Sequence, residues 1–155
     1  AEAMSRDFIG ALIVIERATG TGEITESGVK LDALVSAELL VNVFSPHTPL
    51  HDGAVVIRGN RILAAACVLP LSEAHSSGTK LGTRHRAALG MSERTDAVMV
   101  VVSEETGGIS LASEGQLHRD LGHNEMRERL RVLFGLDSRE RKFWRPRGRS
   151  RGRAK

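Results

Sequence analysis

The sequence predicts a single α/β domain with a central mixed, twisted β-sheet and helices on both sides. Three observations favour this fold. Strand-like and helix-like segments alternate along the chain, and several strands are apolar at successive positions, as in a sheet covered on both faces. At least one pair of strands has the pattern of a hairpin, so the sheet is not wholly parallel. With 155 residues, the chain is long enough for one ordinary domain and too short for two.

The first half of the domain is expected to contain a strand, a helix and a hairpin. The segments are strand 9–15, helix 31–44, and hairpin strands 54–57 and 62–69. The first strand is a dense aliphatic run, which indicates burial on both faces. In the helix, Leu and Val recur near helical spacing until Pro46 ends the pattern. The hairpin strands flank a Gly59-Asn60 turn.

The second half is expected to contain a polar loop, two helices and two strands. The segments are loop 72–82, a helix starting over 83–90, strands 97–102 and 109–112, and amphipathic helix 118–136. A basic tail follows. Residues 139–155 contain nine Lys or Arg and one acid, whereas residues 1–138 contain 13 basic and 18 acidic residues. The pI near 9.6 is therefore a property of the tail. The predicted domain boundaries are 1–138 for the globular part and 139–155 for a disordered tail.

Composition excludes several classes of protein. The single cysteine, Cys67, excludes an internal disulfide framework and a cysteine-based zinc cage, and its apolar surroundings favour a buried side chain over a nucleophile. The chain has no apolar run long enough for a membrane span and no signal-peptide pattern, so a soluble, cytosolic chain is expected. Aromatic residues make up only 3 %, which argues against an aromatic platform for single-stranded nucleic acid.

Three polar clusters interrupt the apolar pattern, each beside a predicted strand end, where α/β folds usually bind ligands. The first is His51-Asp52-Gly53-Ala54. Asp52 is a candidate for holding a divalent metal or polarising a hydroxyl, with His51 as a second ligand. The alternative is an ordinary Asp-Gly turn before a strand.

The second cluster is Gly82-Thr83-Arg84-His85-Arg86. A Gly and a Thr at a helix start offer free backbone N–H groups and a hydroxyl, and the basic residues add charge suited to a polyphosphate. The alternative is a solvated basic helix face. The third cluster, Ser103-Glu104-Glu105-Thr106-Gly107-Gly108, could orient a metal or a basic group, or form a β-turn with surface acids. The sequence contains no Walker A loop, Rossmann fingerprint or nucleophile elbow.

Together these segments resemble the diadenylate cyclase (DAC) family. The resemblance rests on Pro49-Leu50-His51-Asp52-Gly53-Ala54, Leu81-Gly82-Thr83-Arg84-His85-Arg86-Ala87-Ala88 and Val102-Ser103-Glu104-Glu105-Thr106-Gly107-Gly108. It extends from about residue 9 to residue 130 and is most similar to the catalytic domain of the membrane-anchored bacterial cyclase. It implies a DAC-type fold on the cytoplasmic side of a bacterial membrane, with the parent protein anchored by helices absent from this sequence.

The resemblance implies that two ATP molecules are converted to cyclic di-AMP and two pyrophosphates, with Mn²⁺ or Mg²⁺. Each chain would hold one ATP, and two copies would meet face to face as a homodimer. The 3′-hydroxyl of one ATP would attack the α-phosphorus of the other. In-line phosphoryl transfer of this kind depends on positioning and charge neutralisation.

The resemblance also implies roles for individual residues. The expected catalytic residues are Asp52, Arg84 and His85, and the expected metal ligands are His51 and Asp52. The expected nucleotide-binding residues are Gly53, Ala54, Leu69, Thr83, Arg84, His85, Arg86, Ser103 and Glu105. Val68 departs from the family pattern, which places an aromatic residue against the adenine. The loss of that ring predicts weaker stacking, by about 1–3 kcal/mol per base.

Two alternatives to the cyclase stay open at this point. The same fold could serve as a catalytically inactive nucleotide sensor, although the polar residues of all three clusters are in place. The basic tail could bind nucleic acid through phosphate contacts, or touch anionic lipid headgroups, but a solvated end is the favoured interpretation.

Overall fold

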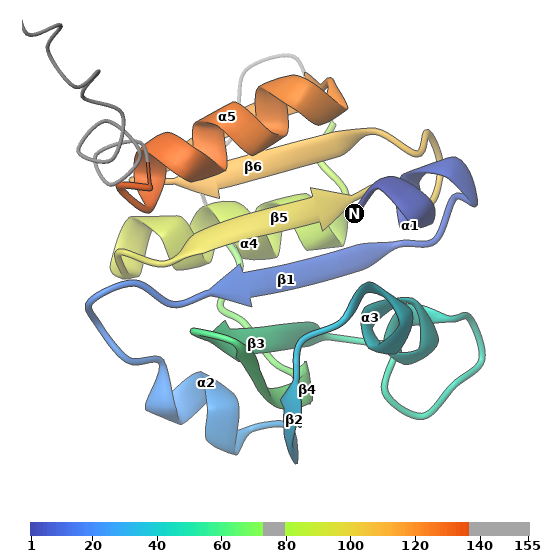
Figure 1. The fold of residues 1–155 in the computed structure, drawn as a ribbon, viewed down its shortest axis with the longest axis vertical. Helices are drawn as coiled ribbons and strands as arrows, with labels where there is room; N and C mark the ends of the chain where they lie inside the picture. Colours follow the sequence, from blue (N-terminus) through green and yellow to red (C-terminus); the bar gives the residue numbers. More distant parts are fainter. Residues whose placement is uncertain (73–79, 137–155) are drawn as a thin grey trace, which may run out of the picture.

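A seven-stranded mixed sheet forms the centre of the computed structural model, which describes residues 1–72 and 80–136 (Figure 1). The strand order is β2-β4-β3-β1-β5-β6-β7. The elements are α1 Glu2–Arg6, β1 Ala11–Ile15, α2 Gly22–Glu26, β2 Val29–Leu34, α3 Ala37–Phe44, β3 Ala54–Arg58, β4 Arg61–Cys67, α4 Thr83–Arg94, β5 Val98–Val102, β6 Ile109–Ser113, β7 Gln116–Leu121 and α5 His123–Leu133. Only β1 and β3 pair in parallel among these neighbouring strands, so the predicted mixed α/β sheet is confirmed.

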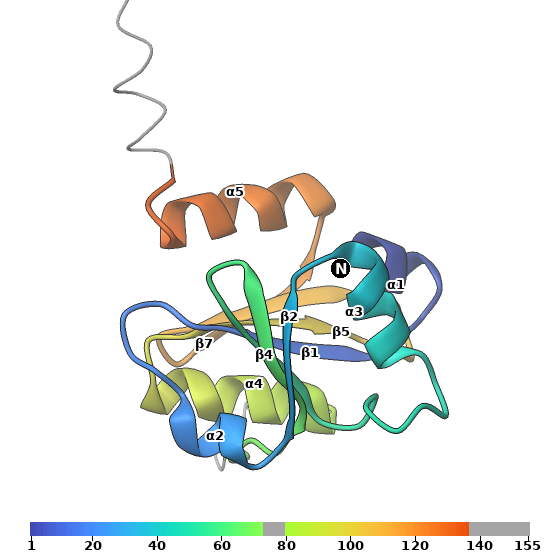
Figure 2. The same ribbon diagram turned by 60° about the horizontal axis from the view of Figure 1, so that its bottom comes forward.

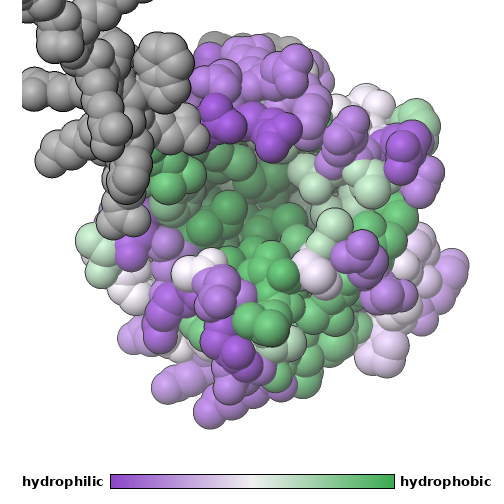
Figure 3. Space-filling view, in the orientation of Figure 1, coloured by the Kyte–Doolittle hydropathy of each residue, from purple (hydrophilic) through white to green (hydrophobic). Residues whose placement is uncertain are grey.

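The sheet is covered on both faces, as predicted. Alternate residues of β1 enter two separate cores, because successive side chains of a strand point to opposite faces. Ala11 and Ile13 pack in the core beneath α1, α3 and α5, whereas Leu12 and Val14 pack in the core against α4. Figure 2 shows α4 and α5 on opposite sides of the sheet. Figure 3 shows apolar residues gathered over the middle of the face on which α5 lies. The expectation of a strand buried on both faces at this position is therefore confirmed.

Two strands were missing from the sequence prediction, and both are edges of the sheet. The helix predicted over 31–44 is wrong at its start, because Val29–Leu34 forms β2 and α3 begins only at Ala37. Ser36 caps α3 by accepting a hydrogen bond from Leu39 N at 3.1 Å. The helix predicted over 118–136 is also wrong at its start, because Gln116–Leu121 forms β7. Edge strands are partly exposed and lack the continuous apolar run that marks a buried strand.

The predicted hairpin is confirmed as β3 and β4, with Gly59 in the turn at φ +58°. The short helices α1 and α2 were not predicted. The predicted tail 139–155, and residues 73–79 of the predicted loop, lie outside the described residues, so the domain boundary at 138 stays a prediction. Within 1–72 and 80–136, none of the helices is both long and apolar enough to span a lipid bilayer.

A buried carboxylate ties the end of β1 to the hairpin. The Glu16 side chain is only 2 % exposed. It accepts hydrogen bonds from Thr21 N at 2.8 Å, Thr21 Oγ1 at 2.6 Å and Arg58 Nε at 2.6 Å. Burial alone would raise the pKa of Glu16, but the hydrogen bonds from Arg58 and Thr21 outweigh it and hold this pKa below its ordinary value of 4.5. The charged form of Glu16 therefore stabilises the fold.

We predict that Glu16→Gln lowers the free energy of unfolding by about 1–3 kcal/mol at pH 7, because buried Thr21 and the Arg58 guanidinium lose a charged acceptor. The Glu16 contribution is fully present above the unfolded-state pKa and is lost as the pH falls through the lower, folded-state pKa. The difference between the variant and the unaltered chain should therefore shrink below about pH 4.5, measured by urea denaturation across pH. Glu26 is exposed, and its side chain has no hydrogen-bond partner among the described residues, so Glu26→Gln provides the control. Equal effects of the two variants would contradict the role of Glu16.

Candidate active site

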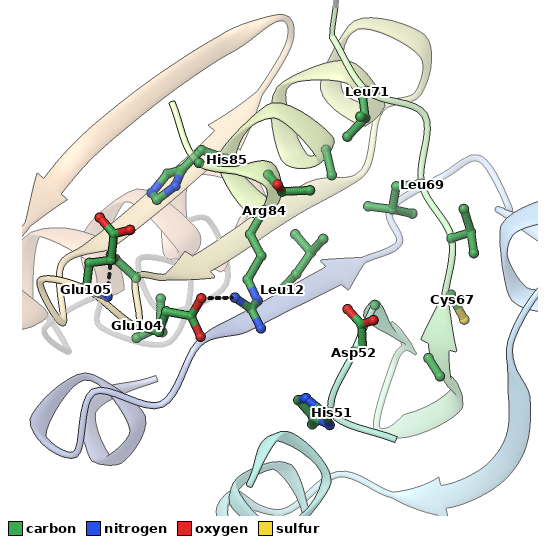
Figure 4. Close-up of a pocket in the computed structure, with 18 of the residues that line it drawn as sticks. Leu12, His51, Asp52, Cys67, Leu69, Leu71, Arg84, His85, Glu104 and Glu105 are labelled. Carbon is green, nitrogen blue, oxygen red and sulfur yellow. Dashed lines mark hydrogen bonds and ion pairs between the residues drawn. The ribbon is translucent and has the colours of Figure 1, made fainter. Parts of the chain in front are cut away.

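A pocket of about 870 Å³ lies where the start of β1 and the ends of β4 and β5 meet the N-terminus of α4 (Figure 4). This volume is typical of a site for a small organic ligand. Nine of the predicted site residues line it: His51, Asp52, Gly53, Leu69, Thr83, Arg84, His85, Ser103 and Glu105. The structure therefore brings all three polar clusters together. Two predicted residues are not among those that line the pocket. Ala54 is buried in β3, and Arg86 is exposed on α4.

Sheet register explains this convergence. Ala11 at the start of β1 is paired with Val102 at the end of β5. Ala54 at the start of β3 is paired with Cys67 at the end of β4. Since β1 and β3 run parallel, these four termini lie side by side at the same end of the strands. The polar segments that precede β3 and follow β5 are therefore neighbours, although some 50 residues separate them in the sequence.

The loop that carries His51 and Asp52 is held by its own backbone. His51 Nδ1 lies 2.6 Å from the carbonyl oxygen of Thr48. A carbonyl only accepts, so Nδ1 carries the proton and Nε2 of a neutral His51 is left with its lone pair available. Gly53 has φ +104°, and a Cβ there would lie 2.8 Å from the Cys67 carbonyl oxygen. Only glycine allows this loop to pass so close to β4.

The donor atoms of His51 and Asp52 fit a divalent cation. They offer an imidazole nitrogen and a carboxylate at the pocket wall, the donor types that Mn²⁺ accepts and, for the carboxylate, that Mg²⁺ prefers. Among the described residues, no group of three or more His, Cys, Asp or Glu could hold a metal ion by itself. Further oxygen ligands would have to come from a phosphate group or water, as is usual for Mg²⁺ at nucleotide sites.

The N-terminus of α4 forms a second side of the pocket. Its N-cap, Gly82, supplies no side-chain hydrogen bond, so the first-turn N–H groups remain available to an anion beside the Thr83 hydroxyl. Arg84 Nη1 lies 3.4 Å from Glu104 Oε1. The Arg84 guanidinium also lies over Gly10, where a Cβ would come within 2.7 Å of its Cζ and Nη1 atoms. Glycine at position 10 therefore leaves space for the guanidinium.

His85 is buried at the base of the pocket, with 6 % of its surface exposed. Burial lowers the pKa of His85 most, and the positive charges of Arg119 and Arg84 lower it further, against the opposing effect of Asp120. His85 is therefore neutral at pH 7, with one ring N–H as a donor. This differs from a cluster of three positive charges, which the spacing Arg84-His85-Arg86 would suggest.

The turn after β5 positions the acids of the third cluster. Ser103 Oγ accepts hydrogen bonds from Glu105 N and Thr106 N, each at 3.2 Å. Gly107 closes the turn with φ +71° and donates to the Ser103 carbonyl at 2.9 Å. The turn itself is what the alternative interpretation of this cluster predicted. It nevertheless places Ser103, Glu104 and Glu105 at the pocket.

Apolar residues form a further part of the pocket wall. In Figure 4, Cys67, Leu69 and Leu71 lie on the side away from Glu104 and Glu105. The residues of this apolar wall come from β1, β4 and the segment after β4: Leu12, Cys67, Val68, Leu69 and Leu71. Val68 is 70 % exposed, and its N–H donates to Ser27 Oγ at 2.9 Å. Cys67 is 1 % exposed, and burial raises the pKa of its thiol to about 11, so the prediction of a buried cysteine is confirmed. The thiol is too weak an acid to act as a nucleophile at neutral pH.

Sequence reasoning did not identify Leu12, Lys80 and Arg119 as residues of this pocket. Arg119 could not be found from the sequence pattern, because it lies on β7, where a helix was expected. Leu12 was predicted in a buried strand, but nothing in an apolar run distinguishes a residue at the pocket from its neighbours.

Residues 1–117 match the family model described as "DAC: DisA bacterial checkpoint controller nucleotide-binding". The chain is 52 % identical over 146 residues to cyclic di-AMP synthase CdaA of Bacillus subtilis, covering 92 % of this chain and 54 % of that protein. It is 54 % identical over 123 residues to a diadenylate cyclase of Listeria monocytogenes, covering 79 % of this chain and 45 % of that protein. The chain thus spans about half the length of these curated relatives.

Two solved structures share the fold. A double mutant of DacA from Staphylococcus aureus matches with a TM-score of 0.83 and 48 % identity, covering 86 % of this chain and 89 % of that one. A structure described as a hypothetical membrane-spanning protein from Bacillus cereus matches with a TM-score of 0.74 and 45 % identity, covering 78 % of this chain and 59 % of that one. The family model alone covers most of the chain, and we conclude that the chain belongs to the DAC family, the DisA bacterial checkpoint controller nucleotide-binding domains.

Proposed function

We propose that the chain is the catalytic domain of a diadenylate cyclase, which condenses two ATP molecules into cyclic di-AMP and releases two pyrophosphates. One observation carries this proposal: three polar clusters, far apart in the sequence, line one pocket of nucleotide size. The matching family model and the names of the relatives, cyclic di-AMP synthase and diadenylate cyclase, support the choice of reaction.

The proposed reaction needs two copies of the chain. Each pocket would hold one ATP, and two pockets would face each other in a homodimer. The 3′-oxygen of each ATP would form a bond to the α-phosphorus of the other, and each bond from an α-phosphorus to pyrophosphate would break. The 3′-hydroxyl protons leave in the same steps. A single chain presents one set of clusters, which is half of this arrangement.

In this proposal, Asp52 accepts the proton of the attacking 3′-hydroxyl. Asp52 and Nε2 of His51 would hold a divalent cation, Mn²⁺ or Mg²⁺, which when bound supplies positive charge beside the phosphates. The hydrogen bond from His51 Nδ1 to Thr48 O fixes the imidazole orientation needed for this role. Removing the carboxylate charge should therefore remove activity without removing the pocket.

Thr83, Arg84 and His85 would hold the phosphates. The free N–H groups at the start of α4 and the Thr83 hydroxyl can donate to phosphate oxygens, and Arg84 can neutralise charge at the reacting phosphorus. Neutral His85 can donate its ring N–H to a phosphate oxygen from a largely buried position. Ser103 and Glu105 would position the phosphate-binding groups from the opposite turn.

The apolar wall would receive the adenine. Leu69 lines the pocket beside exposed Val68, and a backbone amide there could bind the base edge. An aliphatic Val68 offers less stacking surface than an aromatic ring, so we expect modest affinity for the base. The similarity to a membrane-spanning protein of Bacillus cereus supports a membrane-anchored parent protein for this catalytic domain.

We predict that Asp52→Asn abolishes cyclic di-AMP formation, with a loss of at least about 100-fold in initial rate, because the base and a cation ligand are lost together. Product would be measured by liquid chromatography and mass spectrometry with ATP and Mn²⁺. The control is Asp7→Asn, at an exposed aspartate outside the pocket. Full activity of Asp52→Asn, with an unchanged thermal unfolding midpoint, would refute the role assigned to Asp52.

We also predict that Gly10→Ala lowers kcat by about 10- to 100-fold, because the added methyl group displaces the Arg84 guanidinium from its present position. The guanidinium is the flexible end of its side chain, so the thermal unfolding midpoint should change little. Gly22→Ala is the matched control, since a Cβ at position 22 meets nothing within 4 Å. If Gly10→Ala turned over ATP as fast as Gly22→Ala, the position of Arg84 would not matter for catalysis.

A further inference from the structure

The pocket contains little free positive charge for a site that binds a triphosphate. Within the part of the chain that the structure describes, its cations are Lys80, Arg84 and Arg119, and its carboxylates are Asp52, Glu104 and Glu105. With His85 neutral, these charges cancel. A nucleoside triphosphate carries about four negative charges at neutral pH. Its affinity for the pocket therefore depends on cationic side chains that are not already paired with a carboxylate of the protein.

The motif Arg84-His85-Arg86 on α4 contributes less free positive charge to the pocket than its sequence implies. Arg84 is engaged by Glu104 at 3.4 Å, and Arg86 is not among the pocket residues. His85 is buried, and burial and the nearby arginines lower its pKa. Free cationic charge must therefore come from other elements, of which β7 is one.

Strand β7 brings Arg119 to the pocket beside a bulge. Leu117 packs in the core on the α4 side of the sheet, and Arg119 lies two residues further along the strand. His118 between them lines a different groove, beneath α5. The pairing of β7 with β6 shifts register beyond His118, and Asp120 has φ +54°, so regular alternation ends at this point of the strand. Leu117 anchors the strand in the core, and Arg119 beside the bulge lines the pocket. In the described residues, the Arg119 side chain has neither an ion-pair nor a hydrogen-bond partner.

The order of residues along the pocket indicates which phosphates Arg119 would meet. In Figure 4, Leu69 and Cys67 lie at one side, Arg84 lies in the middle, and His85 lies beyond it. Arg119 is close enough to His85 for its charge to act on that imidazole. A nucleotide with its base against Leu69 and its α-phosphate near Arg84 would extend its terminal phosphates toward His85 and Arg119.

We propose that Arg119 binds the β- and γ-phosphates of the nucleotide, and that it sets the preference of this pocket for a triphosphate over a monophosphate. This inference rests on the proposed function in one respect: it takes ATP as the ligand. Arg119 would also hold the pyrophosphate product until release. It is a binding residue for the leaving group and does not contact the attacking hydroxyl.

The test compares the binding of two nucleotides to the full chain and to Arg119→Ala. Isothermal titration calorimetry with Mg²⁺ would use AMP, and an ATP analogue with a methylene bridge between the α- and β-phosphorus, which cannot release pyrophosphate. Loss of a charge-assisted contact should weaken binding of the analogue by about 10-fold or more and leave AMP binding within about 2-fold. Arg94→Ala is the control, because Arg94 is exposed at the far end of α4, outside the pocket.

The outcomes separate this inference from the proposed function. Equal binding of the analogue by Arg119→Ala and Arg94→Ala would overturn the role of Arg119, whether or not the unaltered chain makes cyclic di-AMP. Equal weakening of AMP and the analogue would overturn it too, because Arg119 would then act on the whole pocket. Selective loss of analogue binding would support it even if the chain formed no cyclic di-AMP, an outcome that would contradict the cyclase proposal alone. Arg119→Lys, which keeps the charge, should recover part of the affinity.

Discussion

The candidate site depends on the register of the four central strands. Strand β1 pairs in parallel with β3 and antiparallel with β5, and β3 pairs antiparallel with β4. The starts of β1 and β3 therefore lie beside the ends of β4 and β5, all at one end of the strands. Strands β1 and β5 are buried along almost their whole length and carry only apolar side chains. Most polar residues of the pocket therefore lie in the connections at this end of the sheet and in the first turn of α4, and Arg119 comes from β7. A slip of one residue in β1 would exchange its two core faces and separate Gly10 from Arg84.

The charges of the residues that line the pocket determine what it can bind. Arg84 is paired with Glu104, and His85 is neutral, so the protein holds the pocket close to charge balance. A polyphosphate entering such a pocket needs added positive charge. In the proposed function, the cation at His51 and Asp52 supplies it near the reacting phosphorus, and Arg119 supplies it at the leaving group. This division of charge would favour the steps in which pyrophosphate departs.

The sequence was informative where burial is extreme and uninformative at the sheet edges. Continuous apolar runs identified β1 and β5, and the Gly59-Asn60 turn identified the hairpin. The edge strands β2 and β7 bury few side chains, so their composition resembles that of exposed helices. That error also hid Arg119, because its place at the pocket depends on β7 being a strand of the sheet.

Nine of the eleven expected site residues line one pocket, and most of them occur in three short clusters with distinctive chemistry, but their roles in binding and catalysis stay predictions. Only the structure shows that the clusters converge in one pocket, because the sequence spacing of Asp52, Thr83 and Ser103 does not indicate that they lie close together. The structure also changes the interpretation of one residue of these clusters. Arg86 belongs to the motif by sequence, yet helical geometry turns it away from the residues that line the pocket.

The most direct test of the account follows product formation by the unaltered chain with ATP and Mn²⁺, over a range of chain concentrations. We expect mass spectrometry to detect cyclic di-AMP and pyrophosphate in a ratio of one to two, with a rate per chain that rises with concentration until dimers saturate. Detection of bound ATP without any cyclic di-AMP, at concentrations where the chain is dimeric, would contradict the account and favour a nucleotide sensor.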